Sequence, residues 1–159
     1  GVLQAAGMPP SRLELEITES ALVSNLDSAR DVVGSLRDAG VRIVLDNFGT
    51  GYSSLYHLRN FQLDKIKIDR SFVDDLESVE SARIVSALVG LAHGLGLTIV
   101  ADGVRESGQK ASLLATGCEQ GQGFLFSQAV TAEETLGLFA LAAGGKQRQL
   151  PASDHVSAV

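Results

Sequence analysis

The sequence has little of what several broad classes of protein require. Its 159 residues include no tryptophan, three prolines and one cysteine, Cys118. A single cysteine excludes an internal disulfide and a cysteine-rich zinc site. No apolar run approaches the roughly 20 residues of a membrane-spanning helix, and no secretory signal opens the chain. We therefore expect a cytoplasmic domain without a membrane segment, and any membrane anchor of a longer protein would lie upstream.

Basic residues are also in the minority. Lysine and arginine total 13 against 19 aspartates and glutamates, which gives a net charge of -6. A protein that binds DNA non-specifically normally has the opposite balance, so DNA is not an expected partner. If the ligand is an anion, a positive group must offset these carboxylates, and metal ions commonly do so.

What the chain does contain is an alternation of strand and helix patterns. Its composition, 45% hydrophobic and 20% charged, is that of a globular domain. Apolar periodicity predicts strands at residues 13–18, 41–45, 65–68, 97–101 and 123–126. It predicts helices at residues 25–39, 54–60, 81–94, 107–116 and 131–143, with a glycine-rich loop at 46–53. The alternation implies parallel strands joined by helices, in either an open doubly wound sheet or part of a (β/α)₈ barrel.

The two ends of the chain differ from this pattern. Residues 1–10 resemble the end of a helix stopped by glycine and two prolines, which suggests that a longer domain begins upstream. Residues 144–159 are rich in Gly, Ser, Gln and Ala without apolar periodicity, and we expect a disordered tail. The expected domain therefore covers residues 1–143.

Polar side chains follow or end each predicted strand. In chain order they are Glu16 and Glu19, Asp46 and Asn47, Lys67 and Asp69, Asp102, and Gln122. Each has an ordinary explanation alone, such as a solvated strand face or a helix cap. Together they lie at the carboxyl ends of parallel strands, the face that carries active sites in such folds. Carboxylates with an amide suit Mg²⁺ or Mn²⁺, and a lysine there can position water or stabilise a phosphate oxygen.

Four stretches of the sequence resemble a known family. They are LELEITES (13–20), LDNFGTGYSSLYHLRNFQLDKIKIDRSFV (45–73), IVADGVRE (99–106) and GCEQGQGFLFS (117–127). In this order and spacing they resemble the EAL domain of bacterial cyclic di-GMP phosphodiesterases, which are signal transduction enzymes. The resemblance implies a TIM-type barrel that hydrolyses the second messenger cyclic di-GMP to pGpG with two Mg²⁺ or Mn²⁺ ions. We count five of eight strands, so the fold class expected is α/β, a partial (β/α)₈ barrel without its N-terminal strands.

By motif position, the resemblance implies metal ligands at three residues. Glu16 would bind one ion, Asp46 would be shared by both, and Asn47 stands where the family has a second aspartate ligand. Glu19 would anchor the loop that follows Asp46. In this family that loop helps to form the metal site and a homodimer contact.

The resemblance implies catalytic roles for three further residues. Lys67 would orient the attacking water, and Gln122 would lie near the metal-bound water and phosphate. Asp102 stands where the family has a glutamate needed for catalysis. Arg105 occupies the place of a second glutamate and is a weaker candidate for contacting substrate.

These departures leave the activity of the chain open. Asn47 lacks a carboxylate charge, Asp102 is shorter than glutamate, and the strands with the Glu-Ala-Leu motif and a ligand asparagine are absent. One hypothesis is a phosphodiesterase whose complete domain is active. A second is a degenerate domain that binds cyclic di-GMP or a protein partner without hydrolysis. A third is a truncated barrel without independent function. An upstream GGDEF or sensory domain is a further expected partner.

Overall fold

Five parallel strands form the sheet in the part of the chain that the structure describes. The structure is a computed structural model and describes residues 1–24, 26–49, 61–118 and 120–143. The strands are β1 (Glu14–Thr18), β2 (Arg42–Phe48), β3 (Lys65–Ile68), β4 (Thr98–Ala101) and β5 (Gln120–Gly121). They lie side by side in chain order, each parallel to the next. This order arises when each right-handed βα unit moves to the next strand in the same direction.

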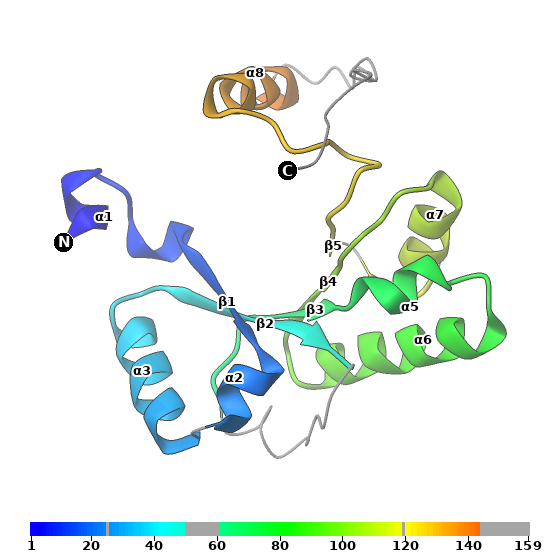
Figure 1. Ribbon diagram of the computed structural model, residues 1–159, viewed down its shortest axis with the longest axis horizontal. Coiled ribbons are helices and arrows are strands. Elements are labelled where there is room, and N and C mark those ends of the chain that lie inside the picture. Colours follow the sequence, from blue (N-terminus) through cyan, green and yellow to red (C-terminus); the bar gives the residue numbers. More distant parts are fainter. Residues whose placement is uncertain (25, 50–60, 119, 144–159) are drawn as a thin grey trace.

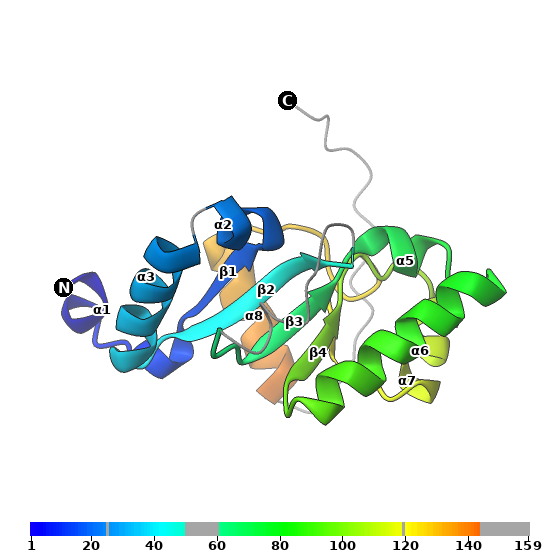
Figure 2. The same cartoon turned by 90° about the horizontal axis from the view of Figure 1, so that it is seen from below.

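Helices connect the strands and flank the sheet (Figure 1). The helices are α1 (Val2–Ala5), α2 (Glu19–Ser24), α3 (Leu26–Asp38), α5 (Arg70–Asp74), α6 (Val79–Gly94), α7 (Ser107–Ala115) and α8 (Ala132–Ala143), with a 3₁₀ turn at Pro10–Arg12. Figure 2 shows α2, α3 and α6 on one side of the sheet and α8 on the other. Among the described residues, no helix is both long and apolar enough to cross a membrane.

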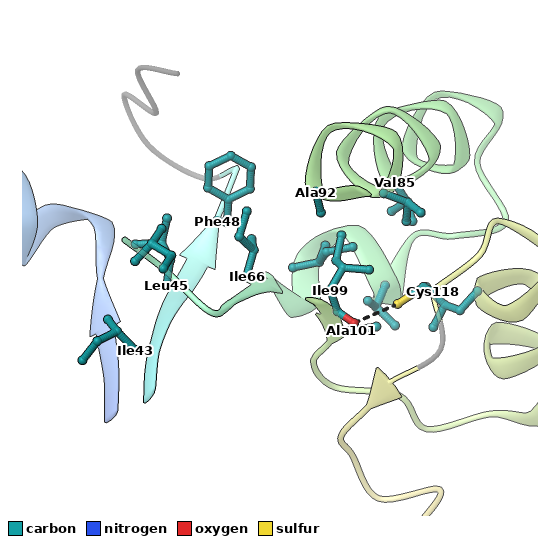
Figure 3. Close-up of a cluster of buried hydrophobic side chains, with 14 of the residues drawn as sticks. Ile43, Leu45, Phe48, Ile66, Val85, Ala92, Ile99, Ala101 and Cys118 are labelled. Atoms are coloured by element: carbon teal, nitrogen blue, oxygen red, sulfur yellow. Dashed lines mark hydrogen bonds between the residues drawn. The ribbon is translucent and has the colours of Figure 1, made fainter. Parts of the chain in front are cut away.

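The hydrophobic core lies between the sheet and the helices on its α6 side. Side chains that alternate along the strands are fully buried here, among them Ile43, Ile66 and Ile99. They lie on the side of the sheet that faces Val85 and Ala92 of α6 (Figure 3). Because successive strand residues point to opposite faces, the residues between them point away from this core.

Most predicted elements are confirmed. Strands were expected at the positions of β1, β3 and β4, and helices at those of α3, α6, α7 and α8. At the start of α8, the Thr131 hydroxyl accepts from the Glu134 backbone N–H, and the Glu134 carboxylate accepts from Thr131 in return. This reciprocal pair is the capping box that the sequence predicts. The short helices α2 and α5 were not predicted.

Two predictions about the strands were wrong. The strand expected at residues 123–126 is a turn, and the last strand is β5, three residues earlier. The backbone explains the shift, since the Gln122 N–H donates to the Ala101 carbonyl while Phe126 N–H closes a turn onto Gly123. The loop predicted from residue 46 begins later, because β2 continues to Phe48. The helix expected at 54–60 and the tail expected at 144–159 lie outside the described residues.

Candidate functional site

The face of the sheet opposite the core is polar. Its side chains line a pocket of about 480 Å³, together with residues of α7 and of the turn after β5. The residues of β1 to β4 that line it are Glu14, Glu16, Val44, Lys65, Lys67 and Val100, and Gln120, Gly121 and Gln122 line it from β5 and the position after it. On β1 and β3 the lining residues are spaced by two, the alternation that turns the intervening Leu15 and Ile66 towards the core. The period-two pattern thus supplies the charged wall of this pocket, and Val104, Leu113, Leu114 and Phe126 supply an apolar one.

Lys67 is the centre of this polar face. Its Nζ lies 2.8 Å from Glu16 Oε2, 3.4 Å from Asp46 Oδ1 and 3.9 Å from Asp102 Oδ2. Its side chain is only 6% exposed. The three carboxylates come from β1, β2 and the end of β4, so the parallel register brings together residues far apart in the sequence.

Burial and charge act on Lys67 in opposite directions. Burial alone lowers the pKa of its ammonium group. The hydrogen bond to Glu16 and the charges of Asp46, Glu16 and Asp102 outweigh burial, so the pKa is raised above its ordinary value of 10.5. Lys67 is therefore a cation at neutral pH, able to donate hydrogen bonds and unable to accept a proton.

An irregularity at the end of β2 places Asp46 and Asn47. Between Leu45 and Phe48 the pairing with β3 shifts its register. Asn47 sits in this irregularity with φ of 57°, a left-handed conformation that asparagine tolerates better than most residues. Asp46 faces Lys67, whereas Asn47 is exposed at the end of the strand.

Asp102 and Gln122 lie on neighbouring loops that are hydrogen-bonded to each other. The Asp102 carboxylate accepts from the Gly103 backbone N–H at 2.8 Å. The Val104 N–H donates to the Gln122 carbonyl at 2.9 Å, which ties the loop after β4 to the end of β5. Gln122 lines the same pocket as Lys67. The two predicted catalytic residues are thus held at the carboxyl ends of adjacent strands.

Glu19 and Arg105 have other surroundings. Glu19 is 9% exposed and opens α2. The Arg105 guanidinium lies 3.5 Å from the Asp74 carboxylate of α5, and its backbone N–H donates to Gln109. Arg105 therefore pairs with a helix carboxylate beside the sheet, and its contact with substrate stays a prediction.

Sequence reasoning missed a second polar layer of the same face. Glu14, Arg42 and Lys65 lie one alternation before Glu16, Val44 and Lys67. Lys65 Nζ lies 2.9 Å and Arg42 Nη1 3.3 Å from the same Glu14 oxygen. The signal was present in the sequence as the spacing of two in Glu14-Leu15-Glu16 and Lys65-Ile66-Lys67. Attention to strand ends alone overlooked it.

The donor chemistry at the carboxyl end fits a hard divalent cation in part. Glu16, Asp46 and Asn47 offer carboxylate and amide oxygens, which Mg²⁺ and Mn²⁺ prefer. Across the described ranges, however, no three or more His, Cys, Asp or Glu residues are grouped so that they could hold an ion. In this arrangement the ammonium of Lys67 lies among the carboxylates. A complete metal site would therefore need oxygen ligands beyond these three.

Fold and site together define a class of protein. Parallel βα units with Asp46, Asp102 and Gln122 at the carboxyl ends of their strands have an α/β architecture of the TIM-barrel type, in which those ends form the active face. The sequence profile of the EAL domain matches residues 1–129. The chain belongs to the EAL domain family.

Individual relatives agree with this assignment. The cyclic di-GMP phosphodiesterase NbdA of Pseudomonas aeruginosa is 44% identical over 127 residues, which are 79% of this chain and 16% of NbdA. The structure of the PaMucR phosphodiesterase in complex with c-di-GMP matches with a TM-score of 0.79 and 40% identity, covering 84% of this chain and 54% of that one. The manganese and cyclic di-GMP complex of Klebsiella pneumoniae BlrP1 matches with a TM-score of 0.75 and 40% identity, covering 79% and 32%.

The relatives are much longer than the match. This chain spans about a sixth of the length of NbdA and a similar share of other curated relatives that it matches. MucR of Pseudomonas aeruginosa, 42% identical over 130 residues, is a bifunctional diguanylate cyclase and cyclic di-GMP phosphodiesterase. The EAL region is thus one part of larger signalling proteins in this family.

Proposed function

We propose that this chain is part of an EAL phosphodiesterase domain that hydrolyses cyclic di-GMP to pGpG. The observation that carries the proposal is the convergence of Glu16, Asp46 and Asp102 on the buried ammonium of Lys67. These residues stand at the family's motif positions. The ligand class also agrees with the complexes of MucR and BlrP1.

Divalent cations complete the proposed site. Glu16, Asp46 and Asn47 are the residues of this chain that would hold them. Bound Mg²⁺ or Mn²⁺ would polarise a phosphodiester and make water more acidic. Manganese in the BlrP1 complex supports a divalent cation, and the choice between the two metals is part of the proposal.

The protein's own residues then divide the remaining work. Lys67 keeps its proton, so it acts as a hydrogen-bond donor that orients water or stabilises charge on a phosphate oxygen. The carboxylates of Glu16 and Asp46 hold that ammonium in one place. Gln122 offers an amide at the rim of the same pocket, where it can hydrogen-bond water or a phosphate oxygen.

A second candidate function is binding of cyclic di-GMP without hydrolysis. Asn47 removes one negative charge from the proposed ligand set. The Asp102 carboxylate is 3.9 Å from Lys67, beyond hydrogen-bond distance. Arg105 replaces a carboxylate and is paired with Asp74. Each substitution weakens turnover more directly than it weakens nucleotide binding, since binding relies on the pocket as a whole.

The partners of the domain are also proposals. The bifunctional nature of MucR supports an upstream GGDEF or sensory domain in a longer protein. A homodimer through the loop after Asp46 follows from the family resemblance, and most of that loop lies outside the described residues. A cytoplasmic location fits the nucleotide substrate.

The test uses the protein encoded by the complete gene, together with its Lys67→Met variant. Conversion of cyclic di-GMP to pGpG is followed by chromatography with Mn²⁺, with Mg²⁺ and with a chelator. We expect metal-dependent turnover that Lys67→Met abolishes and that Asp27→Asn, a change at an exposed pair on α3, leaves intact. Nucleotide binding without turnover would favour the second candidate. Absence of both binding and turnover would refute the two together.

A further inference from the structure

Two lysine–glutamate ion pairs cross the polar face, two residues apart along β1 and along β3. Lys67 Nζ lies 2.8 Å from Glu16, and Lys65 Nζ lies 2.9 Å from Glu14. Both pairs join β1 to β3. These strands share no backbone ladder because β2 lies between them. The two side-chain pairs are therefore direct links between β1 and β3 across the width of β2.

In the part of the chain that the structure describes, Glu14 contacts a second cation, whereas Glu16 pairs with Lys67 alone. Arg42 on β2 stands directly opposite Glu14 in the β1–β2 register, and its Nη1 lies 3.3 Å from the same Glu14 oxygen. Glu14 is thus held by one cation from β2 and one from β3. Its contacts fix the position of β1 along its neighbour as well as across it.

Register matters here because Glu14 and Glu16 occupy equivalent positions on the same face. A slip of one residue would turn the apolar Leu15 and Ile17 towards the pocket and is opposed by the core. A slip of two residues keeps the apolar face buried, and the core opposes it less. It would place Glu16 opposite Arg42, where Glu16 would replace Glu14 beside Arg42 and Lys65, and Lys67 would lose its glutamate. With Glu14 in place, the observed register pairs both Lys65 and Lys67 with a glutamate and is favoured. Without the Glu14 carboxylate, that advantage is lost.

The Lys65–Glu14 pair is partly buried, and this makes its constraint on the register effective. The Lys65 side chain is 17% exposed and that of Glu14 is 34% exposed. Both line the pocket with Glu16 and Lys67. A partly buried pair is screened less by salt than a surface pair, and fixing it requires less loss of side-chain freedom.

We infer that Glu14, held by Lys65 and Arg42, is a positioning residue that fixes the register of β1 and keeps the Glu16 carboxylate on Lys67. Glu14 does not touch the reacting groups. Its consequence for hydrolysis rests on the proposed function, but its consequence for the Glu16–Lys67 contact does not.

The test reads the Lys67 ammonium directly. The chain has four lysines, Lys65, Lys67, Lys110 and Lys146, so ¹⁵N-lysine labelling gives a simple spectrum in which Lys67→Arg identifies the Lys67 signal. In Glu14→Gln, exchange of the Lys67 ammonium protons with water should rise about tenfold, the factor for loss of a hydrogen bond between charged groups. In Lys65→Met it should rise by less, because Arg42 still contacts Glu14. The double variant should match Glu14→Gln, since Lys65 acts through the Glu14 carboxylate. Lys65→Arg should keep the wild-type rate.

The matched control is Asp27→Asn, which removes a carboxylate from an exposed pair on α3. An unchanged Lys67 rate in Glu14→Gln, or an equal change in Asp27→Asn, would overturn the inference. If Glu14→Gln loses the amide dispersion of a folded chain, the Lys67 exchange rates of Lys65→Met and Lys65→Arg are compared instead. Equal rates in these two variants would overturn the inference. A rate that rises as expected while the complete protein shows no turnover would count against the proposed function and leave the positioning role intact.

Discussion

At the scale of single residues, Lys67 determines the electrostatics of the site. Replacing it with methionine leaves Glu16, Asp46 and Asp102 without their shared cation. We expect Lys67→Met to lower the free energy of unfolding by about 2 kcal/mol at neutral pH, the cost of leaving charged groups unpaired near a buried position. Urea denaturation of both chains measures the difference.

The pH dependence of that difference has a definite sign. The pKa of Lys67 is raised on folding because its carboxylate partners outweigh burial. Its stabilising contribution is therefore fully present below the unfolded value of 10.5 and is lost as pH rises through the higher folded value. The difference in free energy of unfolding between wild type and Lys67→Met should stay constant from pH 7 to about 10 and decrease above it. A difference that already decreases below about pH 9 would contradict this account.

Asp102 offers a second prediction at the residue scale. Its Oδ2 is 3.9 Å from Lys67, and its Oδ1 accepts from Gly103. Glutamate is longer by about 1.5 Å, one C–C bond, so Asp102→Glu can reach hydrogen-bond distance to the ammonium. We expect hydrolysis by the complete protein to rise by up to about 10²-fold, the scale of a misplacement of this size. The control is Asp38→Glu at the exposed end of α3; a rate that Asp102→Glu leaves unchanged in a folded protein would show that length at this position is not limiting.

At the scale of elements, the sequence predicted what depends on local pattern. Period-two alternation placed β1, and a short apolar run with β-branched residues placed the first part of β2. The last strand was placed wrongly because β5 is formed by Gln120 and Gly121, which have no apolar signal. Its parallel pairing with Val100 and Ala101 decides its position, and such non-local pairing cannot be predicted from a short stretch of sequence.

The turn after β5 gives a prediction at this scale. A Cβ on Gly123 would lie 2.2 Å from the Val104 carbonyl oxygen, so only glycine allows the two loops to approach. Gly96 also has a positive φ, of +70°, but a Cβ there meets nothing within 4 Å. We expect Gly96→Ala to cost about 1 kcal/mol through backbone strain and Gly123→Ala about 3 kcal/mol or more, because backbone atoms must move. Urea unfolding of both variants checks this, and equal costs would argue against a close approach of the two loops.

At the scale of the whole molecule, the parallel pairing of the strands was predictable from the βα alternation. Their order was not, because the alternation alone allowed an open doubly wound sheet as well as a (β/α)₈ barrel, and the family resemblance favoured the barrel. The cross-strand pairs were not predictable either. Lys65 and Glu14 are 51 residues apart in the sequence. Their contact depends on two registers, β1 with β2 and β2 with β3. Alternation says which face a residue occupies, but not which residue on another strand it meets.

The last prediction concerns association of this chain with itself. Phe124, Leu136 and Phe139 are 67%, 70% and 66% exposed, and they follow one another from the turn after β5 into α8. Large apolar side chains exposed to water favour association. We expect the 159-residue chain, on the order of 10–100 µM, to sediment as a concentration-dependent mixture. The triple change of these residues to serine should shift it towards monomer. Val32→Ser, at a 56% exposed valine on α3, should leave the distribution unchanged, because a single surface valine adds little to any contact. A wild-type chain that is monomeric and unfolds in one sharp transition would show that these side chains do not drive association.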